Sequence, residues 1–319
     1  MRILLTGATG FVGRELLERM VSHIDLQPVA VVRKSSAVLT NHVATFRVAG
    51  IEGDTDWRPA LEGIDAVIHC AARVHVMHDS SSDPLAEFRK VNVDGTLNLA
   101  RQAARAGVRR FIFISSIKVN GEGTELGKPY FADSHPAPLD PYGVSKMEAE
   151  YGLRDLASET GIELVIIRPV LVYGPGVKAN FRSMMNWLRM GVPLPLGAIH
   201  NKRSLVSLDN LVDLIVTCID HPAAANQTFL VSDGEDLSTT ELLRRMSLAL
   251  GKPARLLPVP AALLESAAAM LGKKNVAQRL CGSLQVDISK TRELLGWAPP
   301  VSVDQALRMT ADHYLAHKG

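Results

Sequence analysis

The chain has 319 residues, of which 47% are hydrophobic and 21% are charged, and its formal net charge at pH 7 is +2. This length can hold one large domain or two smaller ones, and the near balance of charge argues against a nucleic-acid-binding surface. No apolar stretch reaches the roughly 18 residues of a membrane-spanning helix, so we expect no membrane partner. Three widely spaced cysteines, an odd number, fit reduced thiols and a cytoplasmic location better than disulfides or a metal site.

The first predicted elements are a short strand and a helix joined by a glycine-rich turn. The strand covers residues 2–5, the turn reads Thr-Gly-Ala-Thr-Gly-Phe-Val-Gly, and the helix covers 14–23. This order predicts dinucleotide binding: Gly7 permits the tight turn, Gly10 lets the backbone approach a pyrophosphate, and Gly13 lets the helix pack on the strand. The N–H groups at the start of the helix favour phosphates. The cofactor contacts predicted here are Gly7, Thr9, Gly10, Phe11, Val12 and Gly13.

Beyond this turn, strand and helix signals alternate. Short β-branched apolar runs are typical of buried parallel strands, and Gly107 and Gly161 stand where two helices should end. The predicted strands cover residues 28–32, 66–69, 111–115 and 164–167, and the next predicted helices cover 88–106 and 142–160. The alternation predicts an α/β fold with a Rossmann-like doubly wound parallel sheet.

The pattern changes after Pro169, where a Gly-Pro-Gly turn and a proline-rich arm follow. The remaining predicted elements are strands at 204–208 and 228–232, which could return to the main sheet, and helices at 237–250, 261–271 and 303–317. The apolar stretch 259–271 is expected to form a buried helix. We expect a dinucleotide-binding domain of residues 1–173 plus about 204–234. A smaller discontinuous C-terminal substrate-binding region would hold about 174–203 and 235–319, with the ligand in the cleft between the two parts.

Tyr142 and Lys146 are four residues apart at the start of a predicted helix, so they share one helix face. A tyrosine with a pKa near ~10 is a poor base at neutral pH, but a nearby ammonium and a nicotinamide charge would lower that pKa. Tyr142 could then exchange a hydroxyl proton while a hydride moves. Ser116 follows the strand at 111–115 and is the candidate partner hydroxyl. We therefore predict Ser116, Tyr142 and Lys146 as the catalytic residues.

These motifs together resemble the extended short-chain dehydrogenase/reductase superfamily, and within it the nucleotide-sugar epimerase/dehydratase family. The resemblance spans nearly the whole chain and includes residues 6–13, 69–72, 91–96, 116, 142–146, 168–175, 203–210 and 295–299. It implies a Ser–Tyr–Lys triad, a nicotinamide cofactor, a UDP-sugar substrate and a homodimer. Further cofactor contacts are expected from Ala71, Ala72, Asn92, Tyr142, Lys146 and Pro169. Substrate contacts are expected from Ser116, Asn180, Arg203 and Arg279, with Arg203 near the diphosphate because a guanidinium fits phosphate oxygens.

Two departures from the family pattern bear on the reaction. Ile117 and Lys118 stand where dehydratases carry an Asp-Glu pair, which argues against 4,6-dehydration. Arg33 and Lys34 follow the second strand, where NAD-specific members usually carry an acidic residue. Because an arginine can pair with a 2′-phosphate, the pattern favours NADP(H), with NAD(H) as the alternative if both residues are ordinary surface cations.

The cofactor bears on the reaction because a reductase consumes NADPH, whereas an epimerase returns the hydride to its own substrate. We therefore expect an oxidoreductase acting at C4 of a UDP-sugar, with reduction of a UDP-4-keto-6-deoxy-N-acetylhexosamine in surface-polysaccharide synthesis as the first hypothesis. The alternative is a UDP-hexose 4-epimerase with tightly bound NAD, and a remote one is a non-catalytic NAD(P)-sensing protein. His69 is interpreted as a packed histidine near the cofactor, and no metal is expected.

Overall fold

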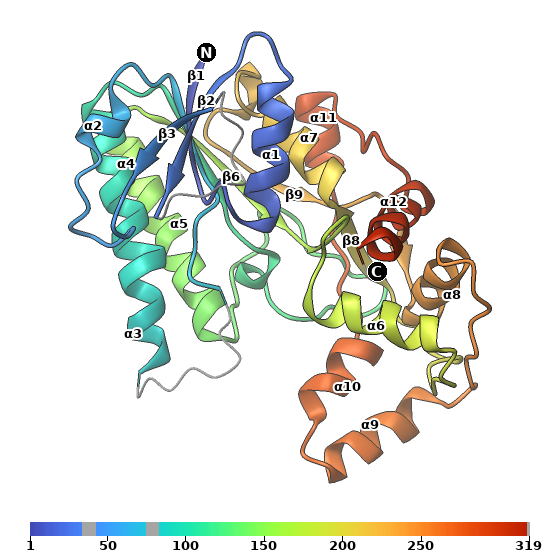
Figure 1. Cartoon of the computed structure of the whole chain (residues 1–319). Coiled ribbons are helices and arrows are strands. Elements are labelled where there is room, and N and C mark those ends of the chain that lie inside the picture. Colours follow the sequence, from blue (N-terminus) through green and yellow to red (C-terminus); the bar gives the residue numbers. More distant parts are fainter. Residues whose placement is uncertain (34–42, 75–82, 318–319) are drawn as a thin grey trace.

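The computed structural model describes residues 1–33, 43–74 and 83–317. A seven-stranded sheet forms its centre, with the strand order β3-β2-β1-β4-β5-β6-β9 and every neighbouring pair parallel (Figure 1). This order is that of a doubly wound dinucleotide-binding sheet, so the predicted α/β fold is confirmed. The strands are β1 (Arg2–Thr6), β2 (Gln27–Val32), β3 (Ala44–Arg47), β4 (Ala66–His69), β5 (Arg110–Ile114), β6 (Glu163–Pro169) and β9 (Gln227–Val231).

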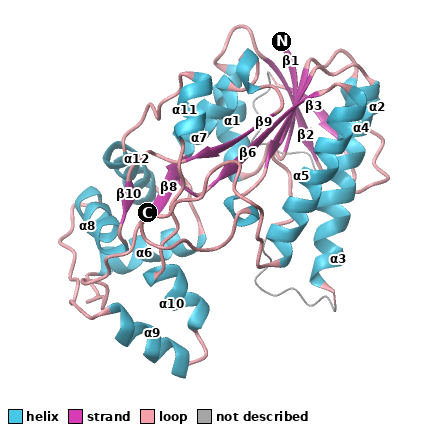
Figure 2. Ribbon diagram, turned by 180° about the vertical axis from the view of Figure 1, so that it is seen from behind, coloured by secondary structure: helices cyan, strands magenta, loops and turns pink. Residues whose placement is uncertain are grey.

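Helices cover both faces of the sheet (Figures 1 and 2). The three central residues of β1 are all apolar because Ile3 and Leu5 face one core while Leu4 faces the other. The first core packs against α1 (Phe11–Val21), α7 (Leu208–Thr217) and α11 (Ser289–Leu295), and the second against α2 (Arg58–Leu61), α4 (Thr96–Arg105) and α5 (Pro141–Thr160). The short helix α3 (Pro84–Arg89) lies beside α5.

The helix predicted at 88–106 is interrupted in the structure. The chain passes from α3 through a π-helical turn, η1 (Lys90–Gly95), before α4 begins. A Cβ atom on Gly95 would lie 1.7 Å from the backbone oxygen of Ile51, so the turn can approach that loop because residue 95 is glycine. Periodicity could not reveal the interruption, because the apolar spacing continues through it.

The C-terminal half contains a second, three-stranded sheet in the order β10-β8-β7. Its strands are β7 (Leu171–Tyr173), β8 (Arg203–Ser207) and β10 (Asp236–Leu237). The strand predicted at 228–232 returns to the main sheet as β9, which pairs with β6 at its edge. The strand predicted at 204–208 does not return there: it forms β8 and pairs with β7, because β9 already occupies that edge. The other helices are α6 (Ala179–Met190), α8 (Thr239–Ala249), α9 (Ala261–Met270), α10 (Lys274–Cys281), α12 (Val303–Ala316), and the 3-10 turns η2 (Ile117–Val119) and η3 (Pro222–Ala224).

The stretch 259–271 was expected to be a buried helix, and this expectation is wrong. Helix α9 has no buried residue, although its sequence is strongly apolar. It packs on α10 and projects from the end of the C-terminal half (Figures 1 and 2). Among the described residues, no helix is long and apolar enough to cross a membrane.

The packing also bears on the domain division. Leu284, Val286, Leu295 and Trp297 are buried in the same core as α1 and β9, whereas α6, α8 and α12 share a separate core. We therefore propose that the expected division holds, except that residues 284–297 join the dinucleotide-binding domain.

The closeness of α1 to the glycine turn gives a stability test. In Gly13→Ala, the new Cβ would lie 2.1 Å from the backbone oxygen of Gly7. We expect a loss of about 1–3 kcal/mol in the free energy of unfolding, measured by urea denaturation. In the control Gly123→Ala, the nearest atom would be 3.4 Å away, so the change should stay within about 0.5 kcal/mol. Equal effects of the two substitutions would contradict the proposed close packing.

Candidate active site

The predicted site residues meet at the carboxyl edge of the main sheet. Gly7 follows β1, Ala71 follows β4, Ser116 follows β5, and Pro169 is the last residue of β6. Because all these strands run parallel, their carboxyl ends lie on one side of the molecule. The crevice at this edge is where doubly wound sheets bind their ligands.

The glycine turn forms an open cradle at this edge. Gly7 has φ +73°, and a Cβ on it would lie 2.8 Å from the backbone nitrogen of Ala71. Gly10 is exposed, and its N–H donates to the oxygen of Gly7 at 2.8 Å. No side chain caps the start of α1, where Thr9 is exposed and Phe11 and Val12 are half-buried. Uncapped N–H groups beside an exposed glycine backbone fit the pyrophosphate of a dinucleotide.

Arg33 is exposed directly after β2, at the same edge. Lys34, which was predicted beside it as a cofactor contact, lies outside the described residues.

Tyr142 stands in the first turn of α5, half-buried, and the Ser116 hydroxyl lies near enough to its phenol to influence the pKa. The ring of Phe88 lies edge-on at 6.0 Å between centroids. Burial, followed by the negative charge of Asp140, raises the pKa of Tyr142 to about 12, against the lowering effect of the nearby Ser116 hydroxyl. The sequence predicts that a nearby ammonium and a nicotinamide charge lower this pKa. In the chain alone the pKa is raised instead, because the effect of burial is the largest.

Lys146 is fully buried one turn along α5, below Tyr142. Its Nζ donates to the backbone oxygen of Ile114 at 2.7 Å and lies 4.2 Å from the ring centroid of Phe113. Burial lowers the pKa of Lys146 to about 8, against the opposing effect of Cys70 and Glu150. With a pKa of about 8, the ammonium remains mostly charged at neutral pH although it is enclosed by the protein.

His69 at the end of β4 is packed, as the sequence interpretation had it. Its ring nitrogens meet the hydroxyls of Thr6 at 2.8 Å and Thr96 at 3.0 Å. Burial, followed by the charge of Lys146, lowers the pKa of His69 to about 3, so the ring is neutral at physiological pH. Both ring nitrogens are thus bonded to threonine hydroxyls inside the fold, which fits a structural role for His69.

Asn92 was predicted as a cofactor contact, and in the structure it connects two parts of the protein. Its side chain accepts from the N–H of Arg73 at 2.8 Å and donates to the hydroxyl of Ser145 at 3.0 Å. Ser145 lies between Tyr142 and Lys146, and its hydroxyl donates to the backbone oxygen of Tyr142 at 2.8 Å. The π turn that carries Asn92 thus ties the loop after β4 to the first turn of α5. We propose that its contribution to the cofactor site is this positioning.

Sequence reasoning missed the role of Asp140. Its carboxylate accepts from the N–H of Gly143 at 2.7 Å, which caps α5, and it also pairs with Lys118. Lys118 makes a second ion pair with Glu122 at 3.0 Å. Burial opposes both charges, but these bonds outweigh it: they raise the pKa of Lys118 and lower the pKa of Asp140. Asp followed by Pro at the start of a helix is a capping signal that could have revealed Asp140.

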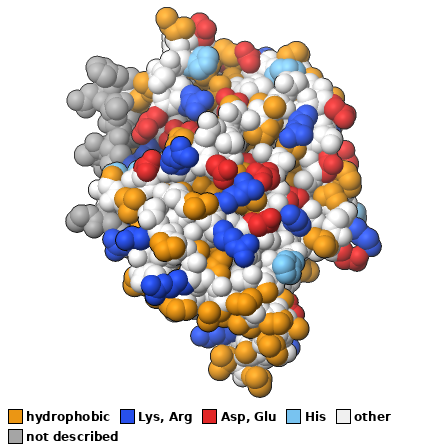
Figure 3. Space-filling view, turned by 90° about the vertical axis from the view of Figure 1, so that its right-hand side faces the viewer, with side chains coloured by type: hydrophobic (Ala, Val, Ile, Leu, Met, Phe, Trp, Pro, Cys, Tyr) orange, Lys and Arg blue, Asp and Glu red, His pale blue; other side chains and the backbone are white. Residues whose placement is uncertain are grey.

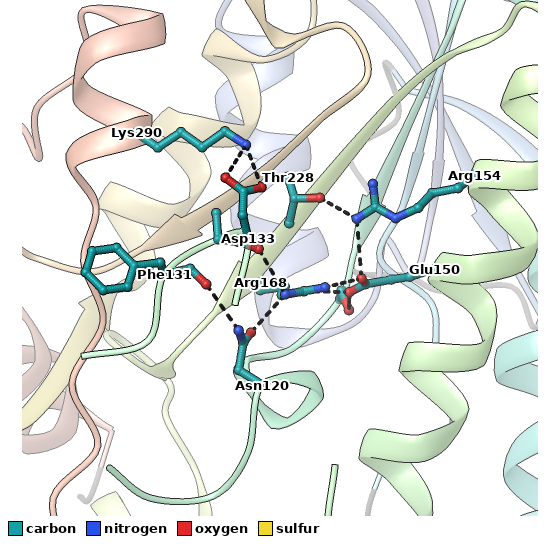
Figure 4. A network of polar contacts seen from close by, with 10 residues as sticks. Asn120, Phe131, Asp133, Glu150, Arg154, Arg168, Thr228 and Lys290 are labelled. Carbon is teal, nitrogen blue, oxygen red and sulfur yellow. Dashed lines mark hydrogen bonds and ion pairs between the residues drawn. The ribbon is translucent and has the colours of Figure 1, made fainter. Parts of the chain in front are cut away.

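A buried ion pair holds α5 against the sheet (Figure 4). Arg168 on β6 donates from Nε to Oε1 of Glu150 at 2.9 Å and from Nη2 to Oε2 at 2.5 Å. Both side chains are at most 3% exposed. The hydroxyl of Ser115, next to Ser116, donates to Glu150 at 2.6 Å, and the Nη1 of Arg168 donates to Asn120 at 3.0 Å. The network fixes α5 relative to the end of β5.

The predicted substrate residues are brought together only in part. The half-buried guanidinium of Arg203 donates to the backbone oxygen of Gly282 at 3.0 Å, and its pKa is lowered by burial and by the charge of Arg279. Two arginines whose charges repel one another form a site suited to an anion. Asn180 is exposed in the first turn of α6, and no contact between described residues joins it to Arg203.

A cavity of about 480 Å³, lined mostly by polar residues and glycines and called the polar cavity below, includes Gly282, the acceptor of Arg203, and Gln278, the chain neighbour of Arg279. Its lining combines the chain after β5 with the end of α10. The lining residues are Gly121, Glu122, Gly123, Thr124, Glu125, Tyr130, Ala137, Leu139, Gln278, Gly282 and Ser283. Sequence reasoning named none of these positions as a substrate contact.

Comparison with known proteins agrees with this architecture. Residues 3–232 match the model of the NAD dependent epimerase/dehydratase family. A UDP-glucose 4-epimerase of Vibrio cholerae is 52% identical over 98% of this chain and 95% of its own length. An N-acetyl-alpha-D-glucosaminyl-diphospho-ditrans,octacis-undecaprenol 4-epimerase of Escherichia coli O157:H7 is 27% identical over 99% and 96%. The structure of a UDP-glucuronic acid 4-epimerase from Bacillus cereus in complex with NAD has a TM-score of 0.80 and 22% identity, with both chains fully covered.

The buried ion pair can be tested by Glu150→Gln, which leaves the guanidinium of Arg168 buried beside a neutral partner. We expect a loss of about 3–5 kcal/mol in the free energy of unfolding, measured by urea denaturation. The control is Lys128→Met, which removes the exposed pair with Glu125, whose side chains are 74% and 75% exposed. That change should cost at most about 1 kcal/mol. Similar losses for both variants would argue against the role given to the buried pair.

The charges around Asp140 predict opposite shifts of the Tyr142 pKa. Lys118→Met leaves the carboxylate uncompensated and should raise this pKa further. Asp140→Asn keeps a capping side chain but removes the negative charge, so it should lower the pKa. The measurement is a titration of tyrosinate absorbance, with each variant compared with the same variant carrying Tyr142→Phe. Shifts of the same sign in both variants would refute the electrostatic link.

Proposed function

The chain belongs to the NAD dependent epimerase/dehydratase family, and we propose that it is a UDP-hexose 4-epimerase that works with tightly bound NAD. The observation that carries this proposal is the 52% identity to a UDP-glucose 4-epimerase along 98% of the chain. It favours the epimerase alternative over the 4-ketoreductase that the sequence pattern placed first. The reductase hypothesis rested mainly on the cations after β2, of which Arg33 is exposed at the sheet edge.

The cofactor site has the features that NAD requires. Gly7 and Gly13 allow β1, the turn and α1 to pack without side chains between them, and Gly10 leaves the start of α1 open to a pyrophosphate. The preference for NADP(H) expected from Arg33 and Lys34 is not supported, because the similar epimerase structure from Bacillus cereus contains NAD. When bound, the nicotinamide supplies a reversible hydride acceptor for C4 of the sugar.

In the proposed mechanism, Tyr142 removes the proton of the sugar C4 hydroxyl and later returns it. Ser116, whose hydroxyl lies near the Tyr142 phenol, holds the same sugar oxygen and stabilises the developing charge. The buried ammonium of Lys146, together with the positive charge of a bound nicotinamide, would favour the phenolate form of Tyr142. Ala71, Ala72 and Pro169, at the ends of β4 and β6, would border the cofactor.

Inversion at C4 requires the sugar to present its opposite face before the hydride returns. The nucleotide must therefore stay bound while the sugar turns. We assign this anchoring to Arg203 and Arg279, whose paired positive charges suit a diphosphate, and the polar cavity beside them leaves room for a polar ligand. Asn180 at the exposed start of α6 is a weaker contact. The homodimer and the cytoplasmic location that the sequence suggested stay predictions.

The function is tested by interconversion of UDP-glucose and UDP-galactose without added reductant. Tyr142→Phe should lower kcat by about 10²–10⁴-fold, because it removes the proton-transfer group. Tyr151→Phe is the matched control, since Tyr151 lies on the same helix with 45% of its surface exposed, and its kcat should be unchanged.

Analysis of the bound cofactor separates the two enzyme hypotheses. For an epimerase, NAD should remain with the protein through desalting and be released on denaturation. A protein that releases its cofactor, binds NADPH better than NADH by about tenfold and shows no interconversion would overturn the proposal in favour of the reductase.

A further inference from the structure

Helices α9 and α10 form a hairpin that projects from the C-terminal half and is apolar on its outside. Figure 3 shows hydrophobic side chains gathered over this end of the molecule. Met270 is 83% exposed, Leu271 72% and Leu263 62%, and α9 has no buried residue. Large exposed apolar groups that gather in one place mark an interaction site more often than scattered single ones do.

The hairpin and α6 enclose an apolar cavity of about 410 Å³ that is separate from the catalytic residues. Leu271 and Val276 contribute from the hairpin, and Trp187 and Val192 from α6 and the chain after it. Thirteen residues line this cavity, and Lys273 is the charged one among them. The exposed apolar surface therefore continues into a cavity with almost no polar group.

Charge on this segment is strongly one-sided. Residues 252–281 contain one acidic residue, Glu265, and five basic residues: Lys252, Arg255, Lys273, Lys274 and Arg279. Lys273 and Lys274 directly follow the exposed tip at Met270 and Leu271. In the described part of the chain, neither lysine is joined to a carboxylate. Exposed apolar side chains next to a pair of lysines are typical of a segment that binds the surface of a membrane.

We propose that the α9–α10 hairpin docks on the surface of a bilayer that contains anionic lipids. Met270 and Leu271 insert among the acyl chains, and Lys273 and Lys274 bind lipid phosphates. A protein partner fits the surface less well, because stable protein interfaces carry about one hydrogen bond per 100–200 Å², and this lining offers few groups to make them. The proposal rests on the surface alone and does not depend on the proposed reaction.

Docking in this way has a consequence for the site. Helix α10 borders both cavities: Val276 and Ala277 line the apolar one, while Gln278 lines the polar one beside Arg203. A bilayer in contact with the hairpin would therefore lie next to the polar cavity. This arrangement differs from a spanning segment, and it revises the expectation from composition that the protein has no membrane partner.

The proposal is tested by flotation of the full chain with lipid vesicles. Wild-type protein should bind phosphatidylcholine vesicles that contain phosphatidylglycerol and bind pure phosphatidylcholine weakly. Lys273→Gln combined with Lys274→Gln should weaken binding about thirtyfold, and Met270→Ser combined with Leu271→Ser at least about tenfold. Ile24→Ser is the matched control, since Ile24 is 94% exposed after α1, and its binding should equal wild type.

Three outcomes would overturn the proposal. The first is no flotation with either vesicle type, and the second is an equal loss in the Ile24 variant and the hairpin variants. The third is that the wild-type protein binds no vesicles but self-associates, as detected by light scattering, and that the hairpin variants abolish this self-association. That result would assign the surface to a second copy of this chain. Tyr142→Phe should float like wild type, so failure of the proposed reaction is distinguished from failure of the docking.

Discussion

The buried pair of Arg168 and Glu150 is the interaction on which the active-site geometry depends. It joins β6 to α5, and Glu150 lies one turn beyond Lys146 on the same helix. Two charges removed from water are costly unless each is fully paired, and here the guanidinium also reaches Asn120 while the carboxylate also accepts from Ser115. A shift of α5 along the sheet would break several of these bonds together. The pair therefore holds the helix in one register.

The first turn of α5 is held from two further sides. Asp140 caps the helix and pairs with Lys118, and Asn92 reaches the same turn through Ser145. Each contact comes from a different loop at the carboxyl edge of the sheet. Catalytic groups need to be held by the packing and hydrogen bonds of their neighbours, and Tyr142 has such support on three sides. The electrostatic result is a phenol whose pKa is raised above its ordinary value, so Tyr142 is neutral at physiological pH in the chain alone.

The two halves of the molecule contribute different parts of the proposed site. The main sheet and its helices place the glycine turn and the proposed triad on rigid elements. The C-terminal half supplies the arginines and the projecting hairpin from shorter helices and loops, and it closes the polar cavity against the chain that follows β5. The proposed 4-epimerase reaction needs both properties, since the reacting groups must stay still while the sugar turns. The apolar hairpin is not required by that chemistry, which is why we interpret it as a docking surface.

The sequence by itself determined the fold class and the candidate triad, because both depend on near neighbours. The spacing of Gly7, Gly10 and Gly13 follows from one turn, and the pairing of Tyr142 with Lys146 follows from helix periodicity. Only the tertiary structure decided which strands pair with β8, how far Tyr142 is buried and whether α9 is covered. It also brought Glu150 to Arg168, 18 residues apart along the chain, in a pair that no local pattern indicates. These properties depend on which distant segments pack against a residue. The packing around Tyr142 raises its pKa, and the lack of packing over α9 leaves that apolar helix exposed, and neither follows from local spacing.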